Sequence, residues 1–255
     1  MNYFFGLKNK DLKSKITIPR FQNRGEINKE YKLYSAEAVD DRWKVLNSNC
    51  DSDGNFYYIE DDLLNNKKIF FLAKSNEIKK LEEINYKYLI DLNTFTNTWP
   101  DFRSNLRIYN EQGGFSSYQS EYPHSMIKKK GSILSPISSL ANIDAEQNKV
   151  FFINIYEKPI EEEFNVFFVD YFLKKIVFKK KIKTNFMNEI DIEKSFINPN
   201  IFLFTKPYIA IPIFMSIKNG HISFEHTHPP HEYILSKDKH KKVSDLKREI
   251  NEIVS

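Results

Sequence analysis

The sequence contains very little cysteine, since Cys50 is the only one among 255 residues. An intramolecular disulfide is therefore excluded, as is typical of chains that fold in a reducing compartment. The sequence also lacks a run of about 20 apolar residues, the length that a membrane-spanning helix needs. Its first residues lack the apolar stretch of a secretory signal. These absences predict a cytoplasmic location and no membrane span.

An excess of charge of one sign is also missing. Lysine and arginine number 38 against 34 aspartates and glutamates, so the formal net charge is +4. Basic runs at residues 128–130, 179–181 and 237–242 adjoin expected strand ends or loops, where lysines usually form a solvated face. No zinc-finger, helix-turn-helix or RNA-binding aromatic signature is present, which argues against nucleic acid as a partner.

The residues that are abundant favour β-structure. Stretches rich in Phe, Val, Ile and Tyr, with short connections between them, predict antiparallel strands at residues 150–156, 164–172, 175–182 and 201–205. We therefore predict a mainly β (α+β) fold whose centre is an antiparallel β-sandwich or barrel. A chain of this length can form one domain or two unequal lobes.

Residues 1–95 have a mixed pattern. A short apolar run at residues 68–73 predicts a buried strand, and Ser75 is a suitable N-cap for a charged helix that follows it. At the other end, Ser244 is a candidate cap for an amphipathic C-terminal helix. The prediction is a small mixed α/β lobe at residues 1–95 and an antiparallel β domain with a C-terminal helix at residues 96–255.

The clearest local signal is a hairpin at Asn219-Gly220. This pair readily adopts the two left-handed conformations of a type I′ turn, and strand-like runs flank it at residues 209–218 and 221–228. A two-residue loop fixes the register, so Lys218 faces His221 and Ile213 faces His226. Because side chains alternate along a strand, His226 and His228 lie on the apolar face, whereas His221 and Glu225 point the other way.

Two imidazoles at positions i and i+2 of one strand can converge on one ion. The sharp turn at Pro229-Pro230 could return His231 or Glu232 as a third ligand. The hypothesis is a divalent transition metal, either iron, manganese or zinc, held by His226, His228, His231 and Glu232, with Glu225 and His221 as general-base or supporting candidates. Two alternatives remain open: structural histidines that cap a sheet, and acid/base histidines without a metal.

The spacing of Gly220, His226, His228 and Glu232 resembles the first metal-binding motif of the cupin β-barrels. In that family two histidines and a glutamate hold an iron, manganese, zinc or similar ion, which is what the resemblance implies for His226, His228 and Glu232. The resemblance covers about a dozen residues. Two features depart from the pattern: Lys239 stands where the motif has a glycine, and no second motif follows before Ser255.

A second candidate site lies between residues 99 and 123. If residues 102–110 form a strand, the side chains of Arg103, Asn105, Arg107 and Tyr109 share one face, and two arginines on one face can clamp an anionic group. The loop and strand that follow mix aromatic rings with amides, hydroxyls and a carboxylate, as carbohydrate sites do. The candidate ligand-binding residues are Arg103, Asn105, Arg107, Tyr118, Gln119, Glu121 and Tyr122. The alternative is that the arginines pair with acidic neighbours on a solvated face and that the tyrosines pack into the sheet.

Three functional hypotheses follow from these two sites. The first is a metal-assisted enzyme or metal-dependent binder of a small polar or sugar-like ligand. The second is a non-enzymatic carbohydrate- or anion-binding module in which the histidines are structural. The third is a scaffold or assembly subunit that pairs through a strand edge or the C-terminal helix.

Overall fold

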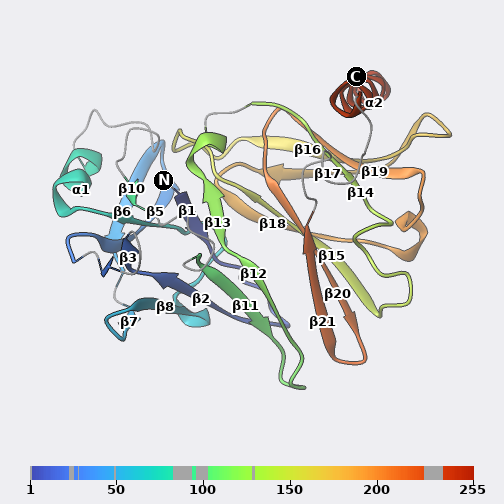
Figure 1. Ribbon diagram of the computed structural model, residues 1–255. Helices are drawn as coiled ribbons and strands as arrows, with labels where there is room; N and C mark the ends of the chain where they lie inside the picture. The colour runs from blue at the N-terminus through green and yellow to red at the C-terminus, as the bar shows by residue number, and fades with distance from the viewer. Residues whose placement is uncertain are drawn as a thin grey trace.

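Antiparallel pairing joins all the strands that the structure describes. The computed structural model describes residues 2–22, 26–27, 29–48, 50–82, 94–95, 103–127, 130–226 and 238–255. Within these ranges the chain is mainly β with few helices, which confirms the mainly β part of the predicted fold class (Figure 1).

Two sheets make up most of the first half of the chain. The six-stranded sheet contains β13 (Glu121–Pro123), β1 (Asn2–Phe5), β9 (Ile69–Ala73), β5 (Lys32–Val39) and β6 (Arg42–Asn47) in that order, with β10 (Thr94–Phe95) paired to β9. The five-stranded sheet contains β12 (Phe115–Gln119), β11 (Asn105–Tyr109), β2 (Lys13–Pro19), β8 (Phe56–Glu60) and β7 (Asp51–Ser52). A short ribbon joins β3 (Phe21–Gln22) to β4 (Glu26–Ile27). Strands from both sides of residue 95 therefore share sheets.

Two four-stranded sheets make up the second half. The central sheet contains β18 (Phe186–Asp191), β15 (Gln147–Asn154), β20 (Ile211–Lys218) and β21 (His221–His226). The outer sheet contains β14 (Ile133–Pro136), β19 (Ile201–Lys206), β16 (Glu163–Asp170) and β17 (Lys175–Lys183). The strands predicted between residues 150 and 205 correspond to β15, β16, β17 and β19 within a few residues at each end, whereas β18 was not predicted.

The four larger sheets form a propeller-like ring of four blades rather than the predicted sandwich. The physical reason lies in the central sheet, which is apolar on both faces. Phe151 and Ile213 on one face join the larger core, which also contains residues of the six- and five-stranded sheets. Phe152 and Phe214 on the other face join a second core against the outer sheet. A sheet of this kind needs a covering layer on each side, which a two-sheet sandwich does not supply.

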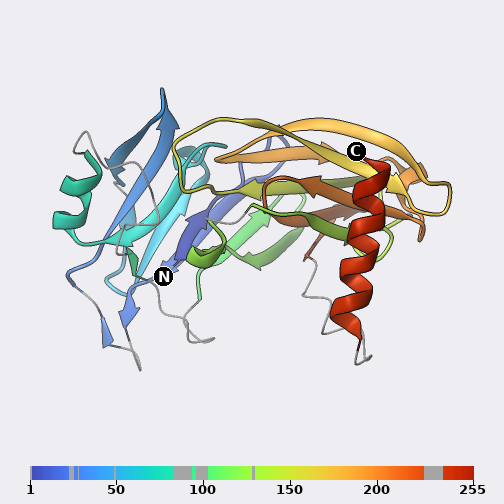
Figure 2. The same ribbon diagram turned by 90° about the horizontal axis from the view of Figure 1, so that it is seen from above.

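The helices lie at the two ends of the molecule (Figures 1 and 2). α1 (Ser75–Glu82) begins at the predicted residue. α2 (Lys239–Ile253) covers the outer sheet, where Ile250 is fully buried against Phe167 and Phe204. The predicted start of this helix is wrong, because Ser244 lies inside it and the cap position belongs to Asp238. Helical spacing locates the buried face but does not mark where the first turn begins.

The described residues also include the short 3₁₀ turns η1 (Asp61–Leu63), η4 (His124–Met126) and η5 (Lys194–Phe196). Neither α1 nor α2, nor any other helix in the described residues, has the length and apolar character needed to cross a membrane.

Candidate functional site

The Asn219-Gly220 hairpin has the predicted geometry. Lys218 pairs with His221, Ile217 with Ile222 and Ile213 with His226. Asn219 and Gly220 adopt φ values of 51° and 76°, which is the left-handed conformation that a type I′ turn requires at both positions. The register that was predicted for β20 and β21 is therefore confirmed as far as His226.

The two faces of β21 differ as the alternation predicts. Ile222 and Phe224 are buried, with 8% and 7% of their surface exposed, and His226 is half-buried on the same face. His221 and Glu225 are exposed on the opposite face. These two side chains therefore do not point toward the imidazole of His226.

The ring of His226 packs against an aromatic neighbour. Its centroid lies 4.7 Å from that of Tyr118, with an interplanar angle of 69°, which is an edge-to-face contact. His228, His231 and Glu232 lie outside the described residues. Within the described ranges no three His, Cys, Asp or Glu side chains gather closely enough to hold a metal ion. The predicted metal site, and with it the likeness to the cupin motif, stays a prediction.

The contact between His226 and Tyr118 belongs to a larger junction between two hairpins. β12 and β21 lie side by side, as do the turns that follow β11 and β20 (Figure 1). The side-chain amide of Asn110 donates a hydrogen bond of 2.8 Å to the carbonyl of Gly220, and Asn110 Oδ1 accepts one of 2.9 Å from the N–H of Gly114. A Cβ atom on Gly114 would lie only 1.9 Å from the Gly220 oxygen, so the two turns approach as closely as glycine allows.

The five-stranded sheet separates the residues of the second candidate site. Leu106 and Ile108 are fully buried, whereas Asn105 and Arg107 are exposed on the other face, as predicted. Tyr118 pairs with Leu106 and faces inward, where burial raises the pKa of its phenol to about 12. Tyr118 and the arginines therefore cannot contact one ligand from the same side.

Tyr122 and Glu121 are also turned inward. Tyr122 is fully buried, burial raises the pKa of its phenol, and its hydroxyl donates a hydrogen bond of 3.2 Å to the carbonyl of Ile209. The carboxylate of Glu121 accepts hydrogen bonds from the N–H of Ser104 (3.3 Å) and from the side-chain amide of Gln119 (2.8 Å). Tyr122 therefore has no surface in contact with solvent.

The outward residues of β2, β11 and β12 form three cross-strand rows, which we call the β11 face. The rows are Lys13–Tyr109–Phe115, Lys15–Arg107–Ser117 and Thr17–Asn105–Gln119. Sequence reasoning missed Lys13, Lys15 and Phe115. The alternation of polar and apolar residues from Lys13 to Ile18 was a signal that could have located β2 and its two lysines.

Arg107 belongs to the β11 face, Arg103 lies just before β11, and neither has an acidic partner among the described residues. The guanidinium of Arg107 lies over the ring of Phe115, 4.5 Å from its centroid, and Phe115 is 59% exposed. Arg103 Nη1 donates a hydrogen bond of 2.8 Å to Gln119 Oε1. In the described part of the chain no carboxylate forms an ion pair with Arg103 or Arg107, although Lys15 pairs with Glu60 at 2.6 Å. The alternative that acidic neighbours neutralise the arginines is therefore not supported.

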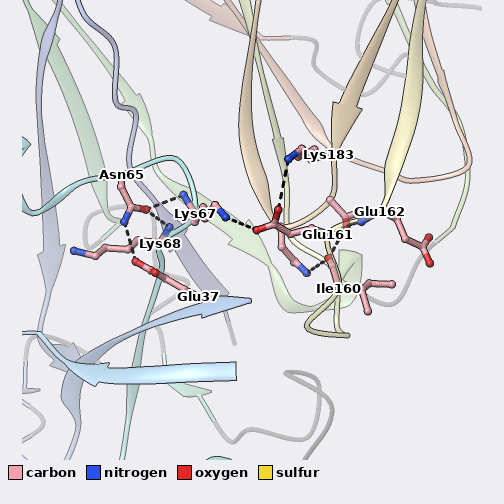
Figure 3. Close-up of polar contacts among 10 residues, drawn as sticks. Glu37, Asn65, Lys67, Lys68, Ile160, Glu161, Glu162 and Lys183 are labelled. Atoms are coloured by element: carbon pink, nitrogen blue, oxygen red, sulfur yellow. Dashed lines mark hydrogen bonds and ion pairs between the residues drawn. The ribbon is translucent and has the colours of Figure 1, made fainter. Parts of the chain in front are cut away.

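A small cavity near the middle of the molecule does not offer a second ligand site. It lies between the turn before β9 and strands β15 and β18, where Asn66, Asn154 and Asn185 line it. Its interior has room for about one water molecule. Figure 3 shows that neighbouring polar groups are engaged with one another, since Lys67 and Glu161 form an ion pair of 2.6 Å. A sugar-sized ligand does not fit there.

Comparison with known proteins does not assign the chain to a family, because neither a scan against family models nor a search of curated proteins found a match.

Proposed function

We propose that this chain is a non-enzymatic module that binds an anionic polysaccharide on the β11 face. The observation that carries the proposal is the pair of exposed guanidinium groups on Arg103 and Arg107, neither of which is neutralised by a carboxylate of the described residues. Guanidinium donors match the geometry of carboxylate and sulfate groups, with which they form two parallel hydrogen bonds. An anionic ligand would supply the partner that the chain itself does not.

The other residues of the face support a sugar polymer over a small anion. Asn105 and Ser117 are exposed and flank Arg107, so they offer an amide and a hydroxyl to sugar hydroxyl groups. The exposed ring of Phe115 offers an apolar surface on which a sugar ring can stack. Small-molecule sites are usually concave, whereas these rows lie on the open face of a sheet, which suits an extended chain.

Affinity electrophoresis through gels that contain alginate, heparin or uncharged dextran tests the proposal. We expect retardation by alginate or heparin but not by dextran. A charge-assisted hydrogen bond contributes about 1.5–3 kcal/mol, so Arg107→Ala should weaken binding about tenfold or more. Arg103→Ala should weaken it to a similar extent.

Arg42→Ala is the matched control, because Arg42 is also an exposed arginine on a strand but lies on β6 of the six-stranded sheet. Its binding should equal that of the unaltered chain. Equal retardation of Arg107→Ala and the unaltered chain would contradict the proposal, and so would equal retardation by dextran and alginate.

A further inference from the structure

The hairpin between β16 and β17 exposes apolar side chains to an unusual extent. Phe172 is 76% exposed, Leu173 55% and Ile176 40%. The turn itself is well supported, since the N–H of Leu173 donates a hydrogen bond of 2.9 Å to Asp170 Oδ1 and Lys174 adopts a left-handed φ of 51°. Phe172 and Leu173 therefore project from an ordered turn and belong to none of the three cores.

The same hairpin concentrates positive charge. The hairpin from Glu163 to Lys183 contains two acidic residues, Glu163 and Asp170, and six lysines, so its formal charge of +4 equals that of the whole chain. The lysines are Lys174, Lys175, Lys179, Lys180, Lys181 and Lys183. The rest of the chain therefore has no net formal charge, because acidic residues balance its other basic runs.

Half of these lysines have no acidic partner in the part of the chain that the structure describes. Lys174 pairs with Glu249 (3.3 Å), Lys181 with Glu163 (2.9 Å) and Lys183 with Glu161 (3.7 Å). Lys180 donates only to a backbone carbonyl, that of Glu189, and Lys179 lies over the ring of Phe167. Among the described residues no carboxylate forms an ion pair with Lys175, Lys179 or Lys180.

We propose that the β16–β17 hairpin docks on the surface of a lipid bilayer that contains anionic lipids. The hairpin projects at the end of the molecule opposite α1, beside α2, where no other described element covers its tip (Figures 1 and 2). Phe172 and Leu173 enter the boundary between headgroups and acyl chains, which accepts apolar side chains to a depth of about 5–10 Å. Lys174 and Lys175 follow directly in the sequence and lie at the level of the headgroups.

The spacing of the remaining lysines suits the same surface. At about 3.4 Å per residue, Lys179 and Lys180 lie about 14–17 Å along β17 from Lys175. They pair with Phe167 and Val166 and so point to opposite faces of the sheet, which means that an inclined hairpin brings one of the two toward the bilayer. If the hairpin is inclined to the bilayer, the distance from such a lysine to the bilayer surface is shorter than its distance along the strand. The attraction of an anionic surface extends over a Debye length of about 8–10 Å. The apolar tip, Lys175 and one of these two lysines can therefore act on one partner.

Other occupants fit these observations less well. A second copy of the chain could pair with the edge strand β17, but lysines along an edge disfavour such pairing. Single-stranded RNA would satisfy the lysines and could stack on Phe172, yet the aliphatic side chains of Leu173 and Ile176 gain little from phosphates or base edges. A folded protein would need a pocket that matches a projecting tip, whereas a fluid bilayer adapts to it.

Co-sedimentation with vesicles of phosphatidylcholine, with and without phosphatidylserine, tests the proposal. We expect binding only where phosphatidylserine is present, and less binding as salt is added. Phe172→Ser combined with Leu173→Ser should lower the partition coefficient about tenfold or more. Lys175→Gln, Lys179→Gln and Lys180→Gln together should lower it at least as far, since each lysine near an anionic surface contributes about fivefold.

The matched control is Leu46→Ser combined with Ile143→Ser, because these side chains are 43% and 50% exposed on other parts of the molecule. It should bind vesicles as the unaltered chain does. The proposal would be overturned if the unaltered chain does not bind phosphatidylserine vesicles. It would also be overturned if the Phe172→Ser/Leu173→Ser variant binds them as well as the unaltered chain does. A chain that binds single-stranded RNA through the same lysines but ignores the vesicles would also overturn it. Arg107→Ala should leave vesicle binding unchanged, so this test is independent of the β11 face.

Discussion

Gly114→Ala tests the close approach of the two hairpin turns. The added Cβ would lie 1.9 Å from the carbonyl oxygen of Gly220 and 3.0 Å from its carbon. A carbon and a carbonyl oxygen normally approach no closer than about 3.3 Å, so the turns must separate by about 1.4 Å or more. Both colliding groups are backbone, and neither can rotate away as a flexible side chain would.

The loss in the free energy of unfolding can be calculated from the contacts that this separation of the turns breaks. The hydrogen bond of 2.8 Å from the side chain of Asn110 to Gly220 would be lost, which costs about 1 kcal/mol. Forcing an extra methyl group into a tightly packed region costs a further 1–3 kcal/mol or so. We therefore expect Gly114→Ala to lower the free energy of unfolding by about 2–4 kcal/mol, which is a large share of the total for a typical domain.

Urea unfolding followed by tryptophan fluorescence measures this change. Gly113→Ala is the control from the same turn, because a Cβ atom on Gly113 would meet open space. Gly113 has a φ of 88°, so we expect this variant to lose only about 1–2 kcal/mol, which comes from backbone strain. Asn110→Ala removes the hydrogen bond directly. The double variant Asn110→Ala/Gly114→Ala should lose about 1 kcal/mol less free energy of unfolding than the sum of the losses in the two single variants, because the hydrogen bond can be lost only once. A Gly114→Ala protein that is as stable as the unaltered chain would refute the reasoning.

Two further predictions concern the contact between Tyr118 and His226. Burial raises the pKa of Tyr118 from 10.0 to about 12, so its neutral phenol stabilises the folded chain fully below pH about 10 and this stabilisation is lost as the pH rises toward about 12. Between pH about 10 and about 12, the urea midpoint should therefore fall less steeply with pH in Tyr118→Phe than in the unaltered chain. Equal slopes of midpoint against pH would contradict the raised pKa of Tyr118. His226→Phe keeps a ring against Tyr118 and should change the free energy of unfolding by less than about 1 kcal/mol, whereas His226→Ala should lower it by about 1–2 kcal/mol. Equal losses of stability in His226→Phe and His226→Ala would contradict a packing role for this ring.

The sequence was most informative where the decisive interactions are local. The conformations of Asn219 and Gly220 depend only on those two residues, and they set the pairing from Lys218 to Ile213. The alternation of buried and exposed residues along β11 was equally accessible, because Leu106 and Ile108 are apolar and Arg107 between them is not. Both features follow from rules that act over a few residues.

The arrangement of the sheets could not be read in the same way. The edge-to-face contact joins Tyr118 to His226 across more than a hundred residues, and nothing in either strand specifies the other as its neighbour. The continuous apolar run in β15 shows that both its faces are buried, but not which sheets cover them. For the same reason the sequence could not show that Tyr118 faces the core while Arg107, on the neighbouring strand, faces solvent.

The double-sided burial of the central sheet has a consequence for synthesis on the ribosome. Residues up to about 127 emerge first, but the core that they share with Phe151, Ile213 and Phe224 cannot close until the central strands have followed. During that interval the early strands present apolar surface and open edges to their surroundings, which is the condition under which nascent chains aggregate or recruit chaperones. The first half of the chain therefore reaches its native state only after the strands that contain Phe151, Ile213 and Phe224 have been synthesised.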